Sequence, residues 1–107
     1  MFTVADLEAA CNIVHGAMPP TPQYAWPLLK RRTGVDVVIK HENHTPTGAF
    51  KVRGGLNLLA QLAVGESRPA GIISATRGNH GQSLAYAARR HGLPMDKFKR
   101  SRLNLRK

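Results

Sequence analysis

The fold is decided by one stretch, Lys40-His41-Glu42-Asn43-His44-Thr45-Pro46-Thr47-Gly48-Ala49-Phe50-Lys51-Val52-Arg53-Gly54-Gly55. It follows a β-branched segment, turns through Pro-Thr-Gly, and brings Lys51 to the opening of a predicted helix. In that place a side chain lies among unpaired backbone N–H groups at the positive end of a helix dipole. This environment disfavours an ammonium ion, and the neutral amine is the form that attacks an aldehyde. The stretch therefore predicts carbonyl chemistry at Lys51.

Strands and helices alternate on both sides of this stretch. We expect helices over Thr3–His15, Leu28–Thr33, Phe50–Val64 and Gln82–His91, strands over Val35–Lys40 and Ala70–Ala75, and an extended proline-rich segment over Ala17–Pro27. Apolar residues recur at helical spacing in the helices, and β-branched residues fill the strands. A strand–helix–strand–helix order with apolar strands is typical of α/β proteins. We therefore predict an α/β fold, a partial parallel sheet with flanking helices.

Two polar loops, Glu42–Ala49 and Thr76–Gly81, leave the carboxyl ends of the predicted strands and enter helices. In open α/β sheets, ligands bind at the carboxyl ends of strands, where helix N-termini face them. If the two strands are neighbours in one sheet, Lys51 and Asn79 face the same crevice. The connectivity alone thus predicts a shared site.

The motifs in these loops resemble those of a known family. The stretch from Lys40 to Gly54, followed by Ser74-Ala-Thr-Arg-Gly-Asn79-His80-Gly-Gln82, is similar to the fold type II pyridoxal-phosphate enzymes, the tryptophan synthase beta superfamily. Within them it resembles the threonine/serine dehydratase branch, because Val52 stands where the synthases carry Asp. The resemblance covers about Pro19 to Pro94. It identifies the chain as an amino-terminal fragment of such an enzyme.

The resemblance implies a cofactor, pyridoxal 5'-phosphate, and a role for each matching residue. Lys51 is the catalytic lysine that holds the cofactor aldehyde and takes the Cα proton of the substrate. Phe50 lies beside the cofactor, and Asn79 hydrogen-bonds its phenolic oxygen. Thr76, Asn79 and His80 belong to the loop that receives the substrate carboxylate. The implied reaction is β-elimination of a hydroxy amino acid, serine or threonine, to a 2-keto acid and ammonia.

The sequence departs from the family pattern at several places. Arg77 stands where racemising relatives place a serine, so serine-racemase activity is not expected. Ala49 is often Ser in the family, which leaves the substrate preference open. No glycine-rich loop for the cofactor phosphate follows Gly92, and the polar partner of the pyridine nitrogen is also missing. Whether this chain is itself an active enzyme is therefore open.

The last residues form a separate compositional block. Six of the 16 Lys and Arg residues lie in Asp96–Lys107, where the relatives continue into an apolar strand. We divide the chain into a dehydratase fragment over residues 1–94 and a basic divergent tail over residues 95–107. The tail is expected to be disordered and without function. A truncation or frameshift would explain it, and translation of the downstream DNA in the other frames would test this.

Composition limits the remaining possibilities. The 107 residues allow one small domain, and no apolar run approaches a membrane span. The single cysteine, Cys11, fits a reducing compartment, so we expect a cytoplasmic protein, with Cys11 itself in the core. His41, Glu42 and His44 lack metal-site spacing and are interpreted as solvated turn residues, and no metal is expected. Tyr24 and Trp26 are interpreted as packing anchors.

Three functions remain after these limits. The first is a pyridoxal-phosphate ammonia-lyase that is truncated and lacks its phosphate loop. Its partner would be a small amino-acid substrate, and the complete enzyme would be a homo-oligomer. The second is a non-catalytic remnant that binds a full-length relative. The third is a basic nucleic-acid-binding polypeptide. The net charge of +10 suggests this function, but the basic residues outside the tail are scattered, which disfavours it.

Overall fold

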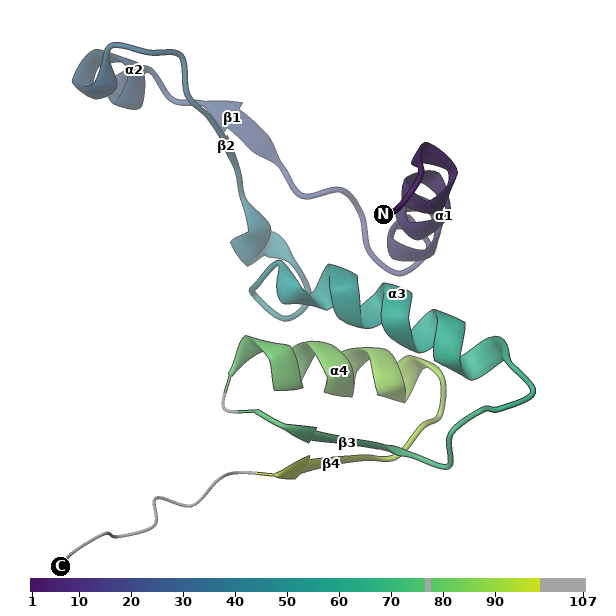
Figure 1. Cartoon of the computed structure of the whole chain (residues 1–107). Coiled ribbons are helices and arrows are strands. Elements are labelled where there is room, and N and C mark those ends of the chain that lie inside the picture. Colours follow the sequence, from purple (N-terminus) through teal and green to yellow (C-terminus); the bar gives the residue numbers. More distant parts are fainter. Residues whose placement is uncertain (77, 99–107) are drawn as a thin grey trace, which may run out of the picture.

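The structure is a computed structural model that describes residues 1–76 and 78–98 (Figure 1). Its elements are α1 (Val4–His15), β1 (Gln23–Ala25), α2 (Pro27–Thr33), β2 (Val38–Lys40), the 3-10 helix η1 (Glu42–His44), α3 (Lys51–Val64), β3 (Ile72–Ala75), α4 (Asn79–Arg90) and β4 (Met95–Phe98). All four predicted helices and both predicted strands are present. The fourth helix begins at Asn79 rather than Gln82, and both strands are shorter than predicted.

The strands form two separate two-stranded sheets. β3 pairs in parallel with β4, with Ile72 opposite Met95, and α4 packs against this sheet, so the predicted α/β class is confirmed. β1 pairs antiparallel with β2, with Gln23 opposite Lys40. The strands before Lys51 and before Asn79 thus belong to different sheets, so the condition under which the sequence predicted a shared crevice is not met. The proline-rich segment supplies the partner of β2 instead.

The start of the predicted tail belongs to the sheet. The expectation of disorder from residue 95 is wrong for Met95–Phe98, which form β4. Met95 is partly buried and packs against the core. Backbone pairing with β3 does not depend on an apolar side chain at every position, so a charged segment can complete the pair. Residues 99–107, with most of the predicted tail, lie outside the described residues.

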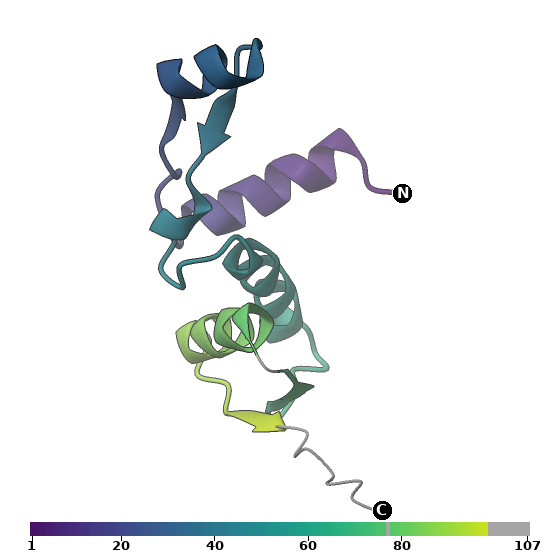
Figure 2. The ribbon, with the colours of Figure 1, turned by 90° about the vertical axis from the view of Figure 1, so that its left-hand side faces the viewer.

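Two parallel helices form the centre of the structure. α3 and α4 lie side by side, with α4 between α3 and the β3–β4 sheet (Figure 2). Their interface is close because Gly55 of α3 faces Ser83 of α4: a Cβ at Gly55 would collide with the Ser83 hydroxyl and lie 2.9 Å from its carbonyl oxygen. The buried core consists of Val14, Met18, Val52, Leu56, Leu59, Leu84, Ala87, Ala88 and Leu93.

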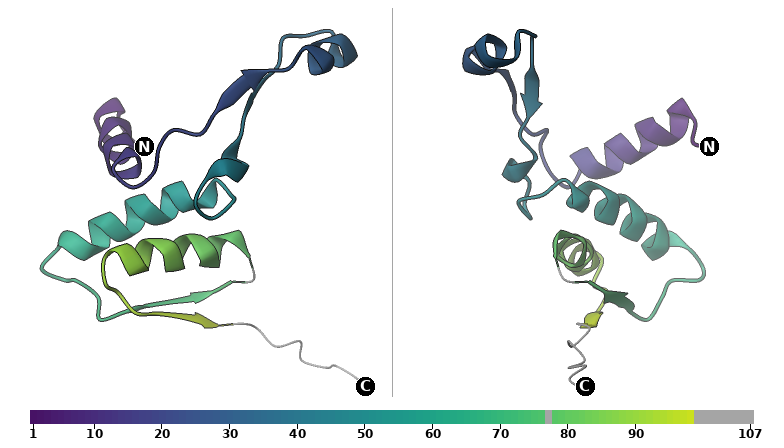
Figure 3. Two further views of the ribbon diagram at one scale, coloured as in Figure 1. Left: turned by 180° about the vertical axis from the view of Figure 1, so that it is seen from behind. Right: turned by 60° about the vertical axis from the view of Figure 1, so that its left-hand side comes forward.

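α1 and the β1–β2 hairpin extend away from this centre. α1 packs on α3 through Val14, whereas the hairpin carries α2 at its far end (Figure 3). The radius of gyration is 18.0 Å, compared with about 13 Å for a compact chain of this length. Cys11 is exposed, so its predicted place in the core is wrong: α1 buries only Val14 among its residues. Among the described residues, none of the helices has the length and apolar character needed to span a bilayer.

Candidate functional site

The turn before Lys51 is held by its own hydrogen bonds. The buried Thr45 hydroxyl accepts a bond from the Ala49 N–H at 2.9 Å and donates to the Ala49 carbonyl at 3.0 Å. The Gly48 N–H donates to the Thr45 carbonyl at 2.9 Å. Gly48 has φ +68°, a conformation that suits glycine because it has no Cβ. The Pro-Thr-Gly turn of the sequence is thus a defined structure that leads directly into α3.

Lys51 is the first residue of α3, as the sequence predicted. Its side chain is exposed, and its Nζ atom lies 5.5 Å from the centre of the Phe50 ring, which is 60% exposed. The rest of the described structure therefore does not enclose this side chain. The amine is instead freely accessible to an incoming aldehyde, with an aromatic face beside it.

The loop before α4 places the other predicted residues. Asn79 and His80 are the first two residues of α4, and both are exposed. The Thr76 hydroxyl accepts a hydrogen bond from the N–H of Gly81, in the first turn of α4, at 3.1 Å. A Cβ at Gly81 would collide with the Thr76 methyl group. The N-cap residue of α4 is Gly78, and Asn79 is the first residue of the helix. Arg77 lies outside the described residues.

The pairing of α3 with α4 brings the two loops to one end. Ser83 is buried, and its hydroxyl donates to the Lys51 carbonyl at 2.6 Å. Because α3 and α4 run in the same direction, Lys51 and Asn79 open neighbouring helices at the same end of the pair (Figure 1). The sequence predicted a shared site for Lys51 and Asn79 on the condition that the two preceding strands were neighbours. Helix packing brings the two residues to the same end instead, through Gly55 and Ser83, which the sequence interpretation did not single out.

Glu42 and Arg53 form an ion pair on either side of the lysine turn. Arg53 Nε lies 2.7 Å from Glu42 Oε2, and Nη2 lies 2.9 Å from Oε1. The buried Thr21 hydroxyl donates to Glu42 Oε1 at 2.6 Å. Hydrogen bonding by Arg53 lowers the pKa of Glu42 from 4.5 to about 2 against the opposing effect of burial. The sequence contains a signal for this pair, because Glu42 and Arg53 carry opposite charges and lie on the two sides of the turn before Lys51.

This pair predicts a loss of stability in acid. The pKa of Glu42 is lower in the folded than in the unfolded chain, so its contribution is complete above pH 4.5 and disappears as the pH falls toward 2. We expect the free energy of unfolding to fall by up to about 3 kcal/mol across this window. Urea unfolding followed by circular dichroism measures it.

The variant Glu42→Gln is the control for this pH dependence. It lacks the titrating group, so its free energy of unfolding should depend less on pH. The variant should be less stable than the parent at pH 4.5, and the two proteins should have similar stability near pH 2. The pKa of Asp6, lowered by the Thr3 backbone N–H, affects both proteins equally. Identical slopes in the two proteins would show that Glu42 does not stabilise the fold.

The histidines near the turn belong to an aromatic cluster. Trp26 Nε1 donates to His41 Nε2 at 3.2 Å. The Tyr24 and His44 rings lie 5.5 Å and 5.9 Å from the His41 ring. Within residues 1–76 and 78–98, no three His, Cys, Asp or Glu side chains gather as metal ligands. Trp26 and Tyr24 contact one another at 5.7 Å between ring centres, as expected of packing anchors, although both stay about half exposed.

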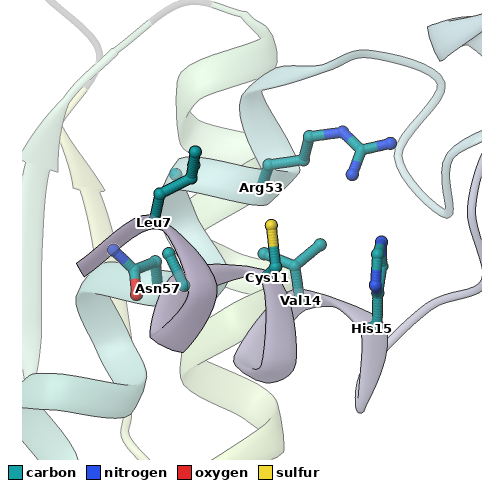
Figure 4. Close-up of a pocket in the computed structure, with 8 residues that line it drawn as sticks. Leu7, Cys11, Val14, His15, Arg53 and Asn57 are labelled. Atoms are coloured by element: carbon teal, nitrogen blue, oxygen red, sulfur yellow. The ribbon is translucent and has the colours of Figure 1, made fainter. Parts of the chain in front are cut away.

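A groove of about 280 Å³ lies between α1 and α3 (Figure 4). Its lining is Leu7, Ala10, Cys11, Val14, His15, Arg53, Gly54 and Asn57. It contains none of the predicted residues Phe50, Lys51, Thr76, Asn79 and His80. The exposed residues of the candidate site at the start of α3 and α4 do not line this groove, which is therefore a separate feature.

Comparison with known proteins decides the family. Residues 14–96 match the sequence pattern of the family described as "Pyridoxal-phosphate dependent enzyme". The chain belongs to this family. The predicted resemblance to fold type II enzymes of the threonine/serine dehydratase branch is confirmed, and the matched region includes both motifs.

Curated relatives include dehydratases and racemases. The chain is 36% identical to the biosynthetic L-threonine dehydratase of Corynebacterium glutamicum over 87% of its own length and 21% of the relative's. It is 36% identical to human serine racemase, of which it covers 28%. It is 35% identical to the L-threonine ammonia-lyase of Thermotoga maritima, of which it covers 23%. The chain thus spans about a quarter of the length of these relatives.

Two solved structures share the fold. A pyridoxal 5'-phosphate-dependent aspartate racemase superposes with a TM-score of 0.83 at 33% identity, over 89% of this chain and 30% of that one. A bacterial threonine deaminase superposes with a TM-score of 0.77 at 30% identity, over 92% of this chain and 34% of that one. Racemases and deaminases are similar to the chain to a comparable degree, so similarity alone does not separate the two reactions.

The residues present fit one part of the family's cofactor. Its aldehyde needs an accessible primary amine, which Lys51 offers, and its ring needs an aromatic or apolar face, which Phe50 offers. Asn79 adds an exposed amide at the start of the neighbouring helix. The amine, the aromatic ring and the amide of these three residues therefore fit the aldehyde and the ring of the cofactor.

Proposed function

We propose that this chain supplies the lysine-bearing part of the site of a pyridoxal-phosphate-dependent ammonia-lyase, which converts serine or threonine into a 2-keto acid and ammonia. The observation that carries the proposal is the position of Lys51, accessible at the start of α3 beside the start of α4. Relatives named threonine dehydratase and threonine ammonia-lyase support the reaction class. The other residues that we assign to the site are Phe50, Thr76, Asn79 and His80.

Each residue has a task that its chemistry allows. The Lys51 amine would hold the cofactor aldehyde and move the proton at the substrate Cα, and Phe50 would flank the ring. The cofactor, when bound, supplies a sink for the negative charge at Cα. The Asn79 amide would donate to the ring oxygen, and the loop with Thr76 and His80 would receive the substrate carboxylate. The Thr76 hydroxyl accepts one bond from Gly81 and keeps its proton to donate.

Reductive trapping tests the assignment of Lys51. The full chain is incubated with pyridoxal phosphate, reduced with borohydride and mapped by peptide mass spectrometry. We expect the label to concentrate on Lys51, because its amine stands at the helix start beside an aromatic ring. The exposed Lys30 is the internal reference. Lys51→Arg should lose the label, since a guanidinium forms no such adduct, whereas the control Lys30→Arg should keep it.

The substrate class is tested in the same assay. L-threonine and L-valine have nearly the same shape and differ by a hydroxyl in place of a methyl group. We expect L-threonine, added before reduction, to lower the Lys51 label more than L-valine does at equal concentration. Equal label on Lys51 and Lys30 in the absence of amino acid would overturn the cofactor assignment. Equal effects of the two amino acids would overturn the substrate class alone.

A further inference from the structure

We propose that Glu42 and Arg53 are positioning residues that hold the lysine turn closed and so orient Lys51 toward its aldehyde partner. The inference rests on the proposed function, and it concerns a contact that neither the motif roles nor the comparisons assign. The ion pair closes residues 42–53 into a loop, with Lys51 two residues before Arg53. The ion pair restricts the backbone of this loop, and the backbone sets the direction in which the Lys51 side chain leaves it.

The geometry of the pair is that of a clamp. Two parallel hydrogen bonds, at 2.7 Å and 2.9 Å, join the guanidinium to the carboxylate and fix their relative orientation as a single contact would not. Both side chains are largely shielded, with 22% and 27% of their surface exposed. Shielding strengthens the attraction and reduces screening by salt. The pair therefore differs from an ordinary surface ion pair, which contributes little.

The clamp is anchored to a third segment of the chain. Thr21, at the entry to β1, is buried and donates to Glu42, while Arg53 Nη2 donates to the Thr21 hydroxyl at 3.3 Å. Lys40 Nζ donates to the Thr21 carbonyl at 3.3 Å and lies 4.0 Å from Glu42. The start of the hairpin, its end and the first turn of α3 thus meet at one carboxylate.

Lys51 is consequently held from two directions. Its own carbonyl accepts from Ser83 on α4 at 2.6 Å, which fixes its backbone relative to the loop with Asn79. The turn that precedes Lys51 is fixed by the hydrogen bonds of Thr45 to Ala49 inside the turn. The Glu42–Arg53 clamp joins the segments on either side of it. The long Lys51 side chain itself is exposed. Its direction of approach therefore depends on how firmly the backbone beneath it is held.

Two variants and one control test the clamp. Glu42→Gln keeps the shape of the side chain and removes its charge. Arg53→Lys keeps the charge and removes the planar guanidinium that donates two hydrogen bonds to the carboxylate. Glu66→Gln is the matched control, an exposed glutamate beyond the far end of α3. The first readout is hydrogen exchange at the amides of residues 45–52, compared with those of α4. The second is the ratio of reductive label on Lys51 to that on Lys30.

We expect both clamp variants to lose protection over residues 45–52 while α4 keeps it, and to lower the labelling ratio about tenfold. The double variant should cost no more than one single variant, because the two residues act as a pair. An unchanged ratio, or unchanged protection of the turn, would overturn the positioning role. A ratio that falls only together with the protection of α4 would also overturn it, since that is general unfolding. If the unmutated chain labels both lysines equally, the proposed function fails, whereas the exchange readout still decides whether the clamp exists.

Discussion

Gly55→Ala is expected to disrupt the pairing of α3 with α4. The added Cβ would meet the Ser83 hydroxyl and lie 2.9 Å from the carbonyl oxygen and 3.0 Å from the carbonyl carbon of Ser83. Rotation of the serine side chain cannot relieve contacts with its backbone, so the helices must separate. Separation also lengthens the bond from Ser83 to the Lys51 carbonyl. We expect a loss of about 3 kcal/mol, from overpacking and from the weakened hydrogen bond.

The adjacent glycine provides a control with the opposite sign. A Cβ at Gly54 meets nothing within 4 Å, although both residues lie inside α3. Gly54→Ala should therefore stabilise the helix by about 1 kcal/mol, the difference in helix propensity. Hydrogen exchange at the amides of α3 and α4 measures the free energy of opening in both variants. A stabilisation by both substitutions would show that the helices do not approach as closely as described.

Local features were the ones that the sequence predicted well. The turn before Lys51 depends on Pro46 and on Gly48, whose positive φ favours glycine, and both signals lie within a few residues. Helix α3 follows from apolar residues at helical spacing. Lys51 at a helix start is a consequence of these two features. The motif that carries the family resemblance is therefore also the part of the chain whose structure is most strongly determined by local interactions.

Pairing between distant segments was predicted poorly. β1 is a three-residue strand with all its side chains exposed, so it lacks the alternation that reveals a strand. β4 contains Asp96 and Lys97, which suggested a solvated tail. The start of α4 was placed three residues late because Gly78 and Gly81 suggested a turn. Gly81 instead allows close contact with Thr76, a requirement that only the three-dimensional arrangement shows.

The candidate site shows the same division. The types of residue at its centre, an amine at one helix start and an amide at the next, follow from the two loops. The contacts that bring the loops together do not. Ser83 and Gly55 lie on helix faces and resemble any small helical residues, and Thr21 precedes Glu42 by 21 residues. The residues that hold the reacting groups in place are remote from them in sequence. A motif therefore identifies the reacting groups more readily than the residues that position them.

Leu59→Ala is expected to have the other large effect, because it removes the centre of the core. Leu59 is fully buried on α3, in the same cluster as Leu56 of α3 and Leu84 of α4. Truncation loses the burial of the removed atoms and leaves a cavity that rigid helices fill only partly. We expect a loss of roughly 2–5 kcal/mol, a large fraction of the total stability of a small domain. Selective labelling of Lys51 should be lost with it, since the paired helix starts depend on this core.

Leu58→Ala is the matched control. The two leucines are neighbours on one helix, but Leu58 is 46% exposed and lies outside the core cluster. Its truncation should cost less than about 1 kcal/mol, the ordinary result of substitution at a half-exposed position, and leave the labelling of Lys51 intact. Exchange protection in α4, the helix that carries neither substitution, separates the two outcomes. Equal losses from Leu58→Ala and Leu59→Ala would mean that α3 does not bury the face described.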